Sequence, residues 1–292
     1  MTLLLSLRAG RLQVDLAPRA GGSIVRFSVD GSRDVLRRTP ADMLAEATAA
    51  TRGNNTACYP LLPFSNRIAG GRFRFDGQQI ALQRNWPCVN HPMHGDGWAM
   101  AWTVERHDVR SAEIAYDHEA ASDGGWPFAY RARQIYRLDE DRLTVRISLQ
   151  NREARAVPAG IGLHPFFVCD AATDLQCRTK SVWLADPEVL PTERIDVPVA
   201  WDFSAGRRIG AVALDNCFEG WDGLARIAWP GRGLTLEMSA SEALRTLVIF
   251  TPPQRPFFCV EPVSHANGQI AATRLAAGDT IAGDVTFRLT IQ

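Results

Sequence analysis

Hydrophobic and polar residues alternate along much of this chain with a period of two. In the segment LTVRISLQN, residues 143–151, the side chains of Leu143, Val145, Ile147 and Leu149 fall on one face, and polar side chains fall on the other. This pattern predicts a β-strand with one face in a hydrophobic core. The same alternation recurs at residues 12–16, 73–75, 234–238 and 287–291.

Turn-forming dipeptides separate the alternating segments. Asp-Gly and Asn-Gly suit the positive φ angles of tight hairpin turns. The stretch GRFRFDGQQIALQ, residues 71–83, is the clearest predicted hairpin, with Asp76 and Gly77 at its turn. Asp-Gly also occurs at 30–31, 96–97, 123–124 and 222–223, and Asn-Gly at 267–268.

Helical signals are sparse. The segment PADMLAEATAA, residues 40–50, combines a proline start with good helix formers, and we expect one short helix there. Strands and helices do not alternate as they do in βαβ units, and the sequence has neither a low-complexity linker nor an internal repeat. We therefore predict an all-β fold: a single large antiparallel β-sandwich domain over residues 1–292, with at most one or two short helices.

Composition and charge narrow the classes of function. The chain has 292 residues, of which 46% are hydrophobic and 22% charged, as is usual for a folded globular protein. Its 32 basic residues balance 32 acidic ones, whereas a nucleic-acid-binding protein usually carries a basic excess. We expect a small, neutral ligand and no nucleic-acid partner.

The compartment is predicted from the N-terminus and the cysteines. The opening residues, MTLLLSLRAG, lack the basic region and cleavage site of a signal peptide and are interpreted as a first strand. No apolar run reaches the roughly 18–20 residues of a membrane-spanning helix. The cysteines form no Cys-x-x-Cys pair and are interpreted as buried, reduced thiols of a cytoplasmic protein. They stand at positions 58, 88, 169, 177, 217 and 259.

A first candidate binding segment is PLLPFSNRIAGGRF, residues 60–73. It places Asn66 and Arg67 inside an apolar stretch bounded by prolines. The guanidinium fork of Arg67 is suited to the hydroxyl or carboxylate oxygens of a ligand. The alternative is an ion pair with an aspartate at a strand end.

A second segment, NHPMHGDGW at residues 90–98, holds His91 and His94. Either the two histidines are a pair of metal ligands, or one of them transfers protons or binds ligand hydroxyl groups without a metal. The proline and glycines exclude a helix, and a metal site needs at least three protein ligands. Acid–base use of His94 is favoured over metal binding because the remaining histidines are scattered, at positions 107, 118, 164 and 265.

Two further segments place ionisable groups in apolar strands. His164, in GIGLHPFF, precedes Pro165, which tends to end a strand. We expect its imidazole at a strand end, either as a proton donor or as a core histidine bonded to a carbonyl. Glu261, in CVEPVSHANG, follows five apolar residues. Burial would raise its pKa and suit it to act as a base, although a salt bridge is the alternative. Asp215, in LDNCF, has a similar setting.

Together these segments supply a base (Glu261), an acid (His164), a second imidazole (His94) and groups that bind oxygen (Arg67 and Asp215). The sequence has no Gly-x-Ser-x-Gly elbow, no cysteine next to a histidine and no glycine-rich phosphate loop. It therefore favours acid–base chemistry on an oxygen-rich ligand.

These motifs jointly resemble the aldose 1-epimerase (galactose mutarotase) family. The segments PLLPFSNRIAGGRFRFDGQ, HPMHGDGW, GIGLHPFF, LDNCF and CVEPVSHANG occur in the order found in that family, and the resemblance covers about residues 10–290. It implies a galactose mutarotase-like β-supersandwich with an open sugar-binding cleft, and neither a metal nor another cofactor in the chemistry. By the same resemblance Glu261 is the catalytic base, His164 the acid and His94 an assisting active-site histidine. The implied substrate-binding residues are Arg67, Asp215 and Asn66.

The implied activity is isomerisation: the α and β anomers of a free aldohexose interconvert as the ring opens and recloses. Opening removes the O1 proton while the ring oxygen gains one, which a carboxylate and an imidazole can do together. The alternatives are a non-catalytic carbohydrate-binding sandwich, a metal-dependent enzyme using His91 and His94, and a hexose-6-phosphate 1-epimerase using Arg72, Arg74 and Arg84. The expected partner is a small-molecule sugar, with neither nucleic acid nor membrane, for a monomer or homodimer.

Overall fold

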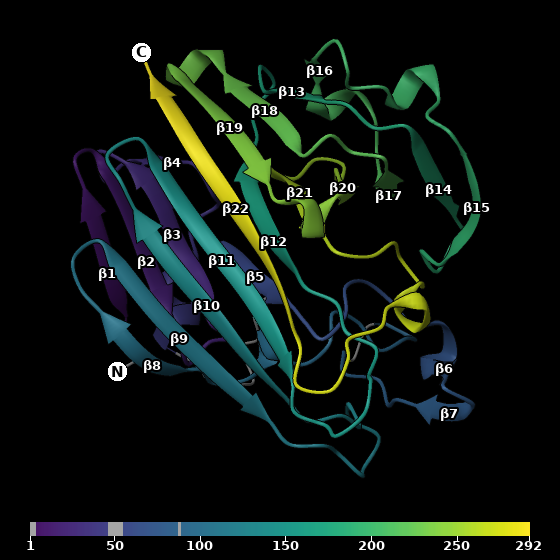
Figure 1. Ribbon diagram of the computed structural model, residues 1–292. Coiled ribbons are helices and arrows are strands. Elements are labelled where there is room, and N and C mark those ends of the chain that lie inside the picture. Colours follow the sequence, from purple (N-terminus) through teal and green to yellow (C-terminus); the bar gives the residue numbers. More distant parts are fainter. Residues whose placement is uncertain (1–3, 46–54, 87–88) are drawn as a thin grey trace.

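The computed structural model describes residues 4–45, 55–86 and 89–292. Most of these residues belong to two large antiparallel sheets, and a two-stranded hairpin projects beside them (Figure 1). The prediction of an all-β antiparallel sandwich is confirmed. None of the helices in the described ranges is long and apolar enough to cross a membrane.

Neighbouring strands of each large sheet are often far apart in sequence. The first sheet runs β1 (Leu5–Ala9), β2 (Leu12–Ala17), β3 (Ser23–Val29), β5 (Cys58–Leu61), β12 (Gly162–Val168), β21 (Phe257–Val263), β20 (Thr246–Phe250), β17 (Asp215–Glu219), β14 (Ser181–Ala185) and β15 (Pro191–Asp196), and β4 (Arg33–Asp34) pairs with β3. The second runs β16 (Arg207–Arg208), β13 (Asp174–Cys177), β18 (Leu224–Trp229), β19 (Leu234–Ala240), β22 (Thr280–Ile291), β11 (Arg142–Asn151), β10 (Tyr130–Leu138), β9 (Ser111–His118) and β8 (Thr103–His107). The projecting hairpin is β6 (Arg72–Phe75) with β7 (Gln78–Ala81).

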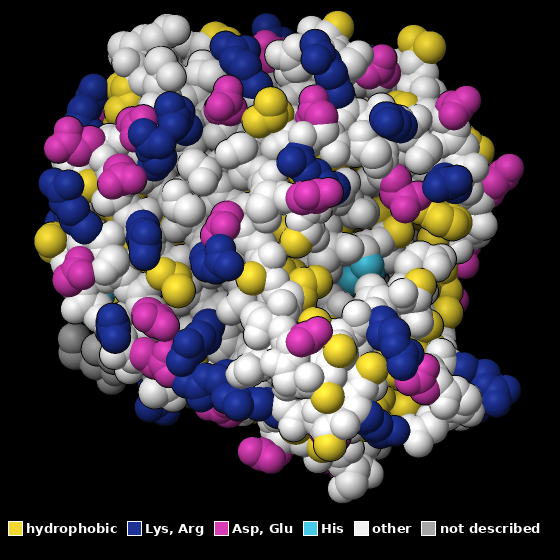
Figure 2. All heavy atoms as spheres, in the orientation of Figure 1, with side chains coloured by type: hydrophobic (Ala, Val, Ile, Leu, Met, Phe, Trp, Pro, Cys, Tyr) yellow, Lys and Arg dark blue, Asp and Glu magenta, His cyan; other side chains and the backbone are white. Residues whose placement is uncertain are grey.

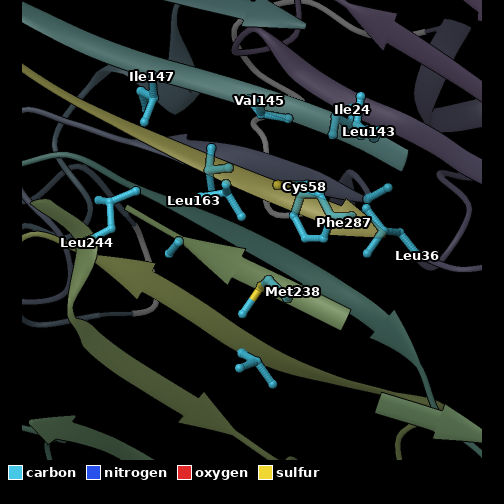
Figure 3. Packing of buried hydrophobic residues seen from close by; sticks show 14 of the residues in the cluster. Ile24, Leu36, Cys58, Leu143, Val145, Ile147, Leu163, Met238, Leu244 and Phe287 are labelled. Carbon is cyan, nitrogen blue, oxygen red and sulfur yellow. The ribbon is translucent and has the colours of Figure 1, made fainter. Parts of the chain in front are cut away.

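The main core lies between the two large sheets. In β11 the four apolar side chains of the alternating segment are buried, and the polar ones between them are exposed or half-buried. Figure 3 shows Leu143 and Val145 of β11 and Phe287 of β22 together with Leu163 of β12 in this core. Each fully buried side chain of this kind contributes about 1.5–3 kcal/mol to folding, so the core fixes the strand register that places the site.

Strands β12 and β21 are buried on both faces. Leu163 and Phe167 of β12 point into the main core, whereas Phe166 belongs to a second apolar cluster on the outer face of the first sheet. A strand buried on both sides appears in sequence as a nearly continuous apolar run. Because His164 and Phe166 share a face, the imidazole lies in this outer layer and not in the main core.

Pro165 does not end the strand that holds His164, so that prediction is wrong. Antiparallel ladders alternate hydrogen-bonded and non-hydrogen-bonded pairs. The bond from Ser264 N to Ile161 O fixes this alternation and directs the missing N–H of Pro165 toward β21. Pairing with β5 on the other side is unaffected, and β12 continues to residue 168.

The turn and helix predictions are confirmed only in part. Asp76 and Gly77 form the predicted hairpin turn, with φ of 47° and 78°. The Asp-Gly prediction at 96–97 is wrong: Asp96 has φ of −119° and precedes a 3₁₀ turn at Gly97–Ala99. A helix occurs at α1 (Ala41–Ala45), and residues 46–50 of the predicted helix lie outside the described residues.

The cysteines of the described residues are free thiols. Cys58, Cys177, Cys217 and Cys259 are buried, as predicted, whereas Cys169 is half-buried. Cys88 lies outside the described residues.

Candidate active site

His164 and Glu261 face each other across strands β12 and β21. The registered pairs on either side place Glu261 directly opposite His164, in a non-hydrogen-bonded position. Side chains are closest together in such positions, and Nε2 of His164 lies 3.3 Å from Oε1 of Glu261. Only 7% of His164 and 2% of Glu261 is exposed. The fold thus brings an imidazole and a carboxyl group into contact at a buried position.

Burial controls the protonation of this pair. It raises the pKa of Glu261 well above its usual value, and the neighbouring Asp215 carboxyl raises it further. Burial also lowers the pKa of His164 well below its usual value. Both displacements disfavour the charged forms, so a neutral imidazole beside a protonated carboxyl is the favoured state of the pair in the free protein.

His94 stands edge-on to His164, with ring centroids 5.4 Å apart and an interplanar angle of 85°. Its Nδ1 accepts a hydrogen bond of 3.0 Å from the backbone N–H of Asn66, and its own backbone N–H donates to Asn66 O. Both residues have left-handed backbones, with φ of 62° at His94 and 57° at Asn66. The reciprocal bonds hold this unusual conformation and fix the direction of the ring.

Arg67 and Asp215 face each other from opposite parts of the chain. Nη2 of Arg67 is 3.9 Å from Oδ2 of Asp215, which is too long for a hydrogen bond. Nη1 of Arg67 donates to Oδ1 of Asn66 over 3.2 Å. Burial raises the pKa of Asp215 while the Arg67 charge lowers it. Asn66 therefore orients the guanidinium. The other N–H groups of Arg67 and the carboxyl of Asp215 remain available to bind a ligand.

These residues line one pocket of about 230 Å³. It contains all six residues singled out in the sequence: Asn66, Arg67, His94, His164, Asp215 and Glu261. In Figure 2 a histidine is visible at the bottom of a hollow, with hydrophobic side chains around it. The geometry brings these six together, whereas the chemical role of each remains a prediction.

The other half of the lining is hydrophobic and was not predicted as site residues. It consists of Tyr59, Trp86, Val89, Met93, Phe166 and Phe250. Phe166 could have been found, because it lies two positions after His164 on the same strand face. Trp86 carries no such local signal: it reaches the pocket by stacking on Trp98, with centroids 5.0 Å apart.

The two histidines of the motif at residues 90–98 have different surroundings. Nδ1 of His91 accepts from the backbone N–H of Gly70, and its Nε2 lies 3.6 Å from a carboxylate oxygen of Glu188. Nδ1 of each ring is thus occupied by a backbone N–H, and of the two histidines only His94 lines the pocket.

Within residues 4–45, 55–86 and 89–292, one other group has the composition of a metal site. His164, Cys259 and Glu261 have potential ligand atoms within 4.8 Å of one another. Metal binding by cysteine requires the thiolate, and burial raises the pKa of the Cys259 thiol well above its usual value. The Cys259 thiol beside the His164–Glu261 pair is therefore protonated, and these three residues would hold a metal only with loss of that proton.

Comparison with known proteins identifies the family. The model of the aldose 1-epimerase family matches residues 4–288. The chain belongs to the aldose 1-epimerase family. YphB, an uncharacterised protein of Escherichia coli K12, is 31% identical over 300 residues, which cover 97% of this chain and 98% of YphB. The resemblance recognised from the motifs is thus confirmed.

Solved structures agree with this assignment. A candidate aldose 1-epimerase of Escherichia coli K12 superposes with a TM-score of 0.90 and 28% identity over the whole of both chains. The galactose 1-epimerase of Lactobacillus acidophilus NCFM gives a TM-score of 0.80 over 97% of this chain and 92% of its own, with 13% identity. At that identity it shows the shared fold alone. Family and fold together imply an isomerase-type enzyme.

Proposed function

We propose that this epimerase interconverts the α and β anomers of an unphosphorylated aldohexose without a cofactor. The observation that carries the proposal is the contact between Nε2 of His164 and Oε1 of Glu261, 3.3 Å apart at the pocket. The hydroxyl oxygen O1 and the ring oxygen of a pyranose are both bonded to C1. A base and an acid that serve these two oxygens must therefore lie close together, as this pair does.

The reaction begins with Glu261 as a carboxylate and His164 protonated. Glu261 removes the proton from O1, the bond between C1 and the ring oxygen breaks, and His164 protonates that oxygen. The pair is now a neutral imidazole beside a protonated carboxyl, which is the state that burial favours. After rotation about C1–C2, Glu261 returns its proton to the carbonyl oxygen. His164 takes up the proton of the attacking hydroxyl, and the other anomer forms.

The remaining polar groups bind and orient the sugar. Nε2 of His94 is the free donor of that ring, since Nδ1 is occupied. The Arg67 guanidinium and the Asp215 carboxyl, with Asn66 behind them, are suited to neighbouring hydroxyl groups. Trp86 and the other hydrophobic side chains of the lining suit the apolar C–H face of a sugar.

The lining favours an uncharged sugar over a phosphorylated one. Arg67 is the single Lys or Arg of the described pocket lining, and it already faces Asp215. The three residues considered for a phosphate group, Arg72, Arg74 and Arg84, are exposed and do not line the pocket.

The test is to monitor the mutarotation of freshly dissolved α-D-glucose and α-D-galactose by polarimetry. We expect the wild type to accelerate equilibration, and Glu261→Gln and His164→Asn each to lose about 10²–10⁴-fold in rate. Glu188→Gln, an exposed carboxylate outside the pocket lining, is the matched control and should retain activity. Wild-type rates in both pocket variants would refute the proposal. Sugar binding without any acceleration would instead favour a carbohydrate-binding module.

A further inference from the structure

A cation lies behind the imidazole of His164, separated from it by one aromatic ring. The His164 and Phe166 rings are stacked, with centroids 4.5 Å apart and an interplanar angle of 18°. The guanidinium carbon of Arg37 lies 3.6 Å from the centroid of the same Phe166 ring. Two groups this close to one ring centre cannot share a face without overlapping, so Arg37 and His164 occupy opposite faces of Phe166.

Arg37 is held rigidly in this position. Its backbone N–H donates to Phe166 O over 2.8 Å, next to the bridge between residues 36 and 167. Its Nε and Nη2 donate to Thr56 O at 3.3 and 3.1 Å. The ring of Phe257 also contacts the guanidinium, whose carbon lies 4.6 Å from the centroid of that ring. The charge is therefore fixed in place and half-buried, so that water screens it less than a fully exposed charge.

A protonated His164 would place a second cation against the ring that already carries Arg37. Aromatic faces attract cations through the ring quadrupole, but two cations on opposite faces repel one another through a medium of low polarity. Arg37 is not in the pocket lining, so it acts on the imidazole without touching the sugar.

We propose that Arg37 is a positioning residue that, across the ring of Phe166, disfavours the protonated form of His164 and so promotes release of its proton. The catalytic consequence rests on the proposed epimerase function. His164 must give a proton to the ring oxygen in the opening step, and an adjacent fixed cation makes that transfer more favourable. The same charge prevents a second proton from accumulating on the pair when Glu261 is already protonated.

Among the groups around His164, Arg37 is a fixed cation whose charge lowers the pKa of the imidazole. Burial raises the pKa of both Tyr59 and Cys259, which leaves the phenol and the thiol uncharged. Burial lowers the pKa of His94 to about 3, which leaves that ring uncharged at neutral pH. The titratable and charged groups that face His164 are Glu261 and Cys259 on β21, Tyr59 on β5, His94 and Arg37, with Arg67 and Asp215 across the pocket. Cys58, next to Tyr59 on β5, lies on the other face of the sheet, in the main core.

The direct test is an NMR pH titration of the His164 imidazole, assigned by comparison with His164→Asn. Arg37→Met and Arg37→Gln both remove the charge, and glutamine keeps a side-chain donor for Thr56 O. In both we expect the His164 midpoint to rise by about one pH unit, a tenfold gain in proton affinity. Arg37→Lys keeps the charge and should keep the wild-type midpoint. Arg155→Met is the matched control, because Arg155 lies over the ring of Phe128 at 5.4 Å, away from the pocket.

The second readout is the pH dependence of kcat. The active pair carries one proton, so its rate profile has an acid and an alkaline limb that belong to the pair jointly. In Arg37→Met and Arg37→Gln the whole profile should move to higher pH. If Arg37 had only a structural role, these substitutions would lower kcat and leave the limbs of the profile at the wild-type pH.

The outcomes separate the two proposals. A raised His164 midpoint in a protein that does not accelerate mutarotation would support the role of Arg37 and refute the epimerase function. The role of Arg37 is overturned if the His164 midpoint is no higher in Arg37→Met and Arg37→Gln than in the wild type. An imidazole that stays neutral in all of these proteins down to the pH of acid unfolding counts as the same negative result. The role is also overturned if Arg37→Lys shifts as far as Arg37→Met.

Discussion

The backbone N–H of Asn66 donates to Nδ1 of His94, and this bond assigns the tautomer of the imidazole. A neutral ring that accepts at Nδ1 carries its proton on Nε2. Burial lowers the pKa of His94 to about 3, so the ring is neutral throughout the range in which the protein would work. His94 therefore offers the pocket a fixed N–H donor and not a titrating acid.

This relationship predicts the effect of His94→Asn. Asparagine tolerates the left-handed backbone at this position, so the variant should fold, but it loses the Nε2–H donor. We expect kcat/KM for mutarotation to fall by about 10²-fold, while the limbs of the pH profile stay where they are. His91→Asn is the matched control and should leave kcat/KM unchanged. A profile whose limbs move in His94→Asn would show that His94 itself titrates during turnover.

Asp215 influences the reaction through Glu261 as well as through the sugar. Burial is the main cause of the raised Glu261 pKa, and the Asp215 charge raises it further. Asp215→Asn removes that charge, so the pKa of Glu261 falls and the pH profile of kcat should move to lower pH. The loss of a charged hydrogen-bond acceptor should also raise KM by about tenfold or more.

The control for this prediction is Glu219→Gln, a carboxylate on the same strand as Asp215 that contacts Trp183 and Arg194 instead of the pocket. It should change neither KM nor the profile. A move of the Asp215→Asn profile to higher pH would contradict the electrostatic coupling, because removing a negative charge cannot raise the pKa of a neighbouring carboxyl group.

Sequence patterns predicted the strands and the polar half of the pocket because both depend on local signals. Period-two alternation identifies β11 by its side chains, and Asp76–Gly77 identifies the hairpin between β6 and β7. An ionisable residue inside an apolar run, as at His164 and Glu261, contradicts its local context and so is recognisable without knowing the fold.

Other features depend on register between distant strands, which local patterns do not reveal. Arg37 reaches Phe166 only because residues 36 and 167 form a bridge. Pro165 was predicted to end its strand from the loss of one donor, but β5 pairs with β12 on the side where no donor is missing. The hydrophobic half of the pocket, such as Trp86, depends on how a loop packs over the sheet.

Gly95 is required by a close approach next to His94. Its φ is 67°, and a Cβ atom there would lie 2.1 Å from the carbonyl oxygen of Leu62. Gly95→Ala should therefore lower the free energy of unfolding by more than about 2 kcal/mol and displace His94. Gly77→Ala is the control: its φ is 78° but a Cβ there meets no atom within 4 Å, so it should cost only about 1 kcal/mol. Equal losses in urea unfolding would show that backbone conformation alone matters.

Asp96 anchors the loop that carries His94 through a second, partly buried cluster. Its carboxylate accepts from the hydroxyls of Tyr116 and Tyr130, and Oδ2 lies 2.7 Å from Nδ1 of His118. Nε2 of His118 lies 2.8 Å from the carbonyl oxygen of Trp126. Both ring nitrogens thus face acceptors, an arrangement that only the protonated imidazole, with two donors, satisfies fully.

The pH dependence of stability should report this cluster. Burial lowers the pKa of His118, but the bond to Asp96 and its charge outweigh burial, and the net pKa is raised. Protonation of an imidazole whose pKa is raised on folding stabilises the folded state. This contribution is complete below the pKa of the unfolded state, about 6.5, and is lost as the pH rises through the pKa of the folded state. Urea unfolding at a series of pH values should show this loss in the wild type. His118→Gln should remove it, and the exposed control His107→Gln should retain it. If His118→Gln keeps the wild-type slope, the imidazole is not charged in the folded protein and Asp96 holds the loop through the two tyrosines alone.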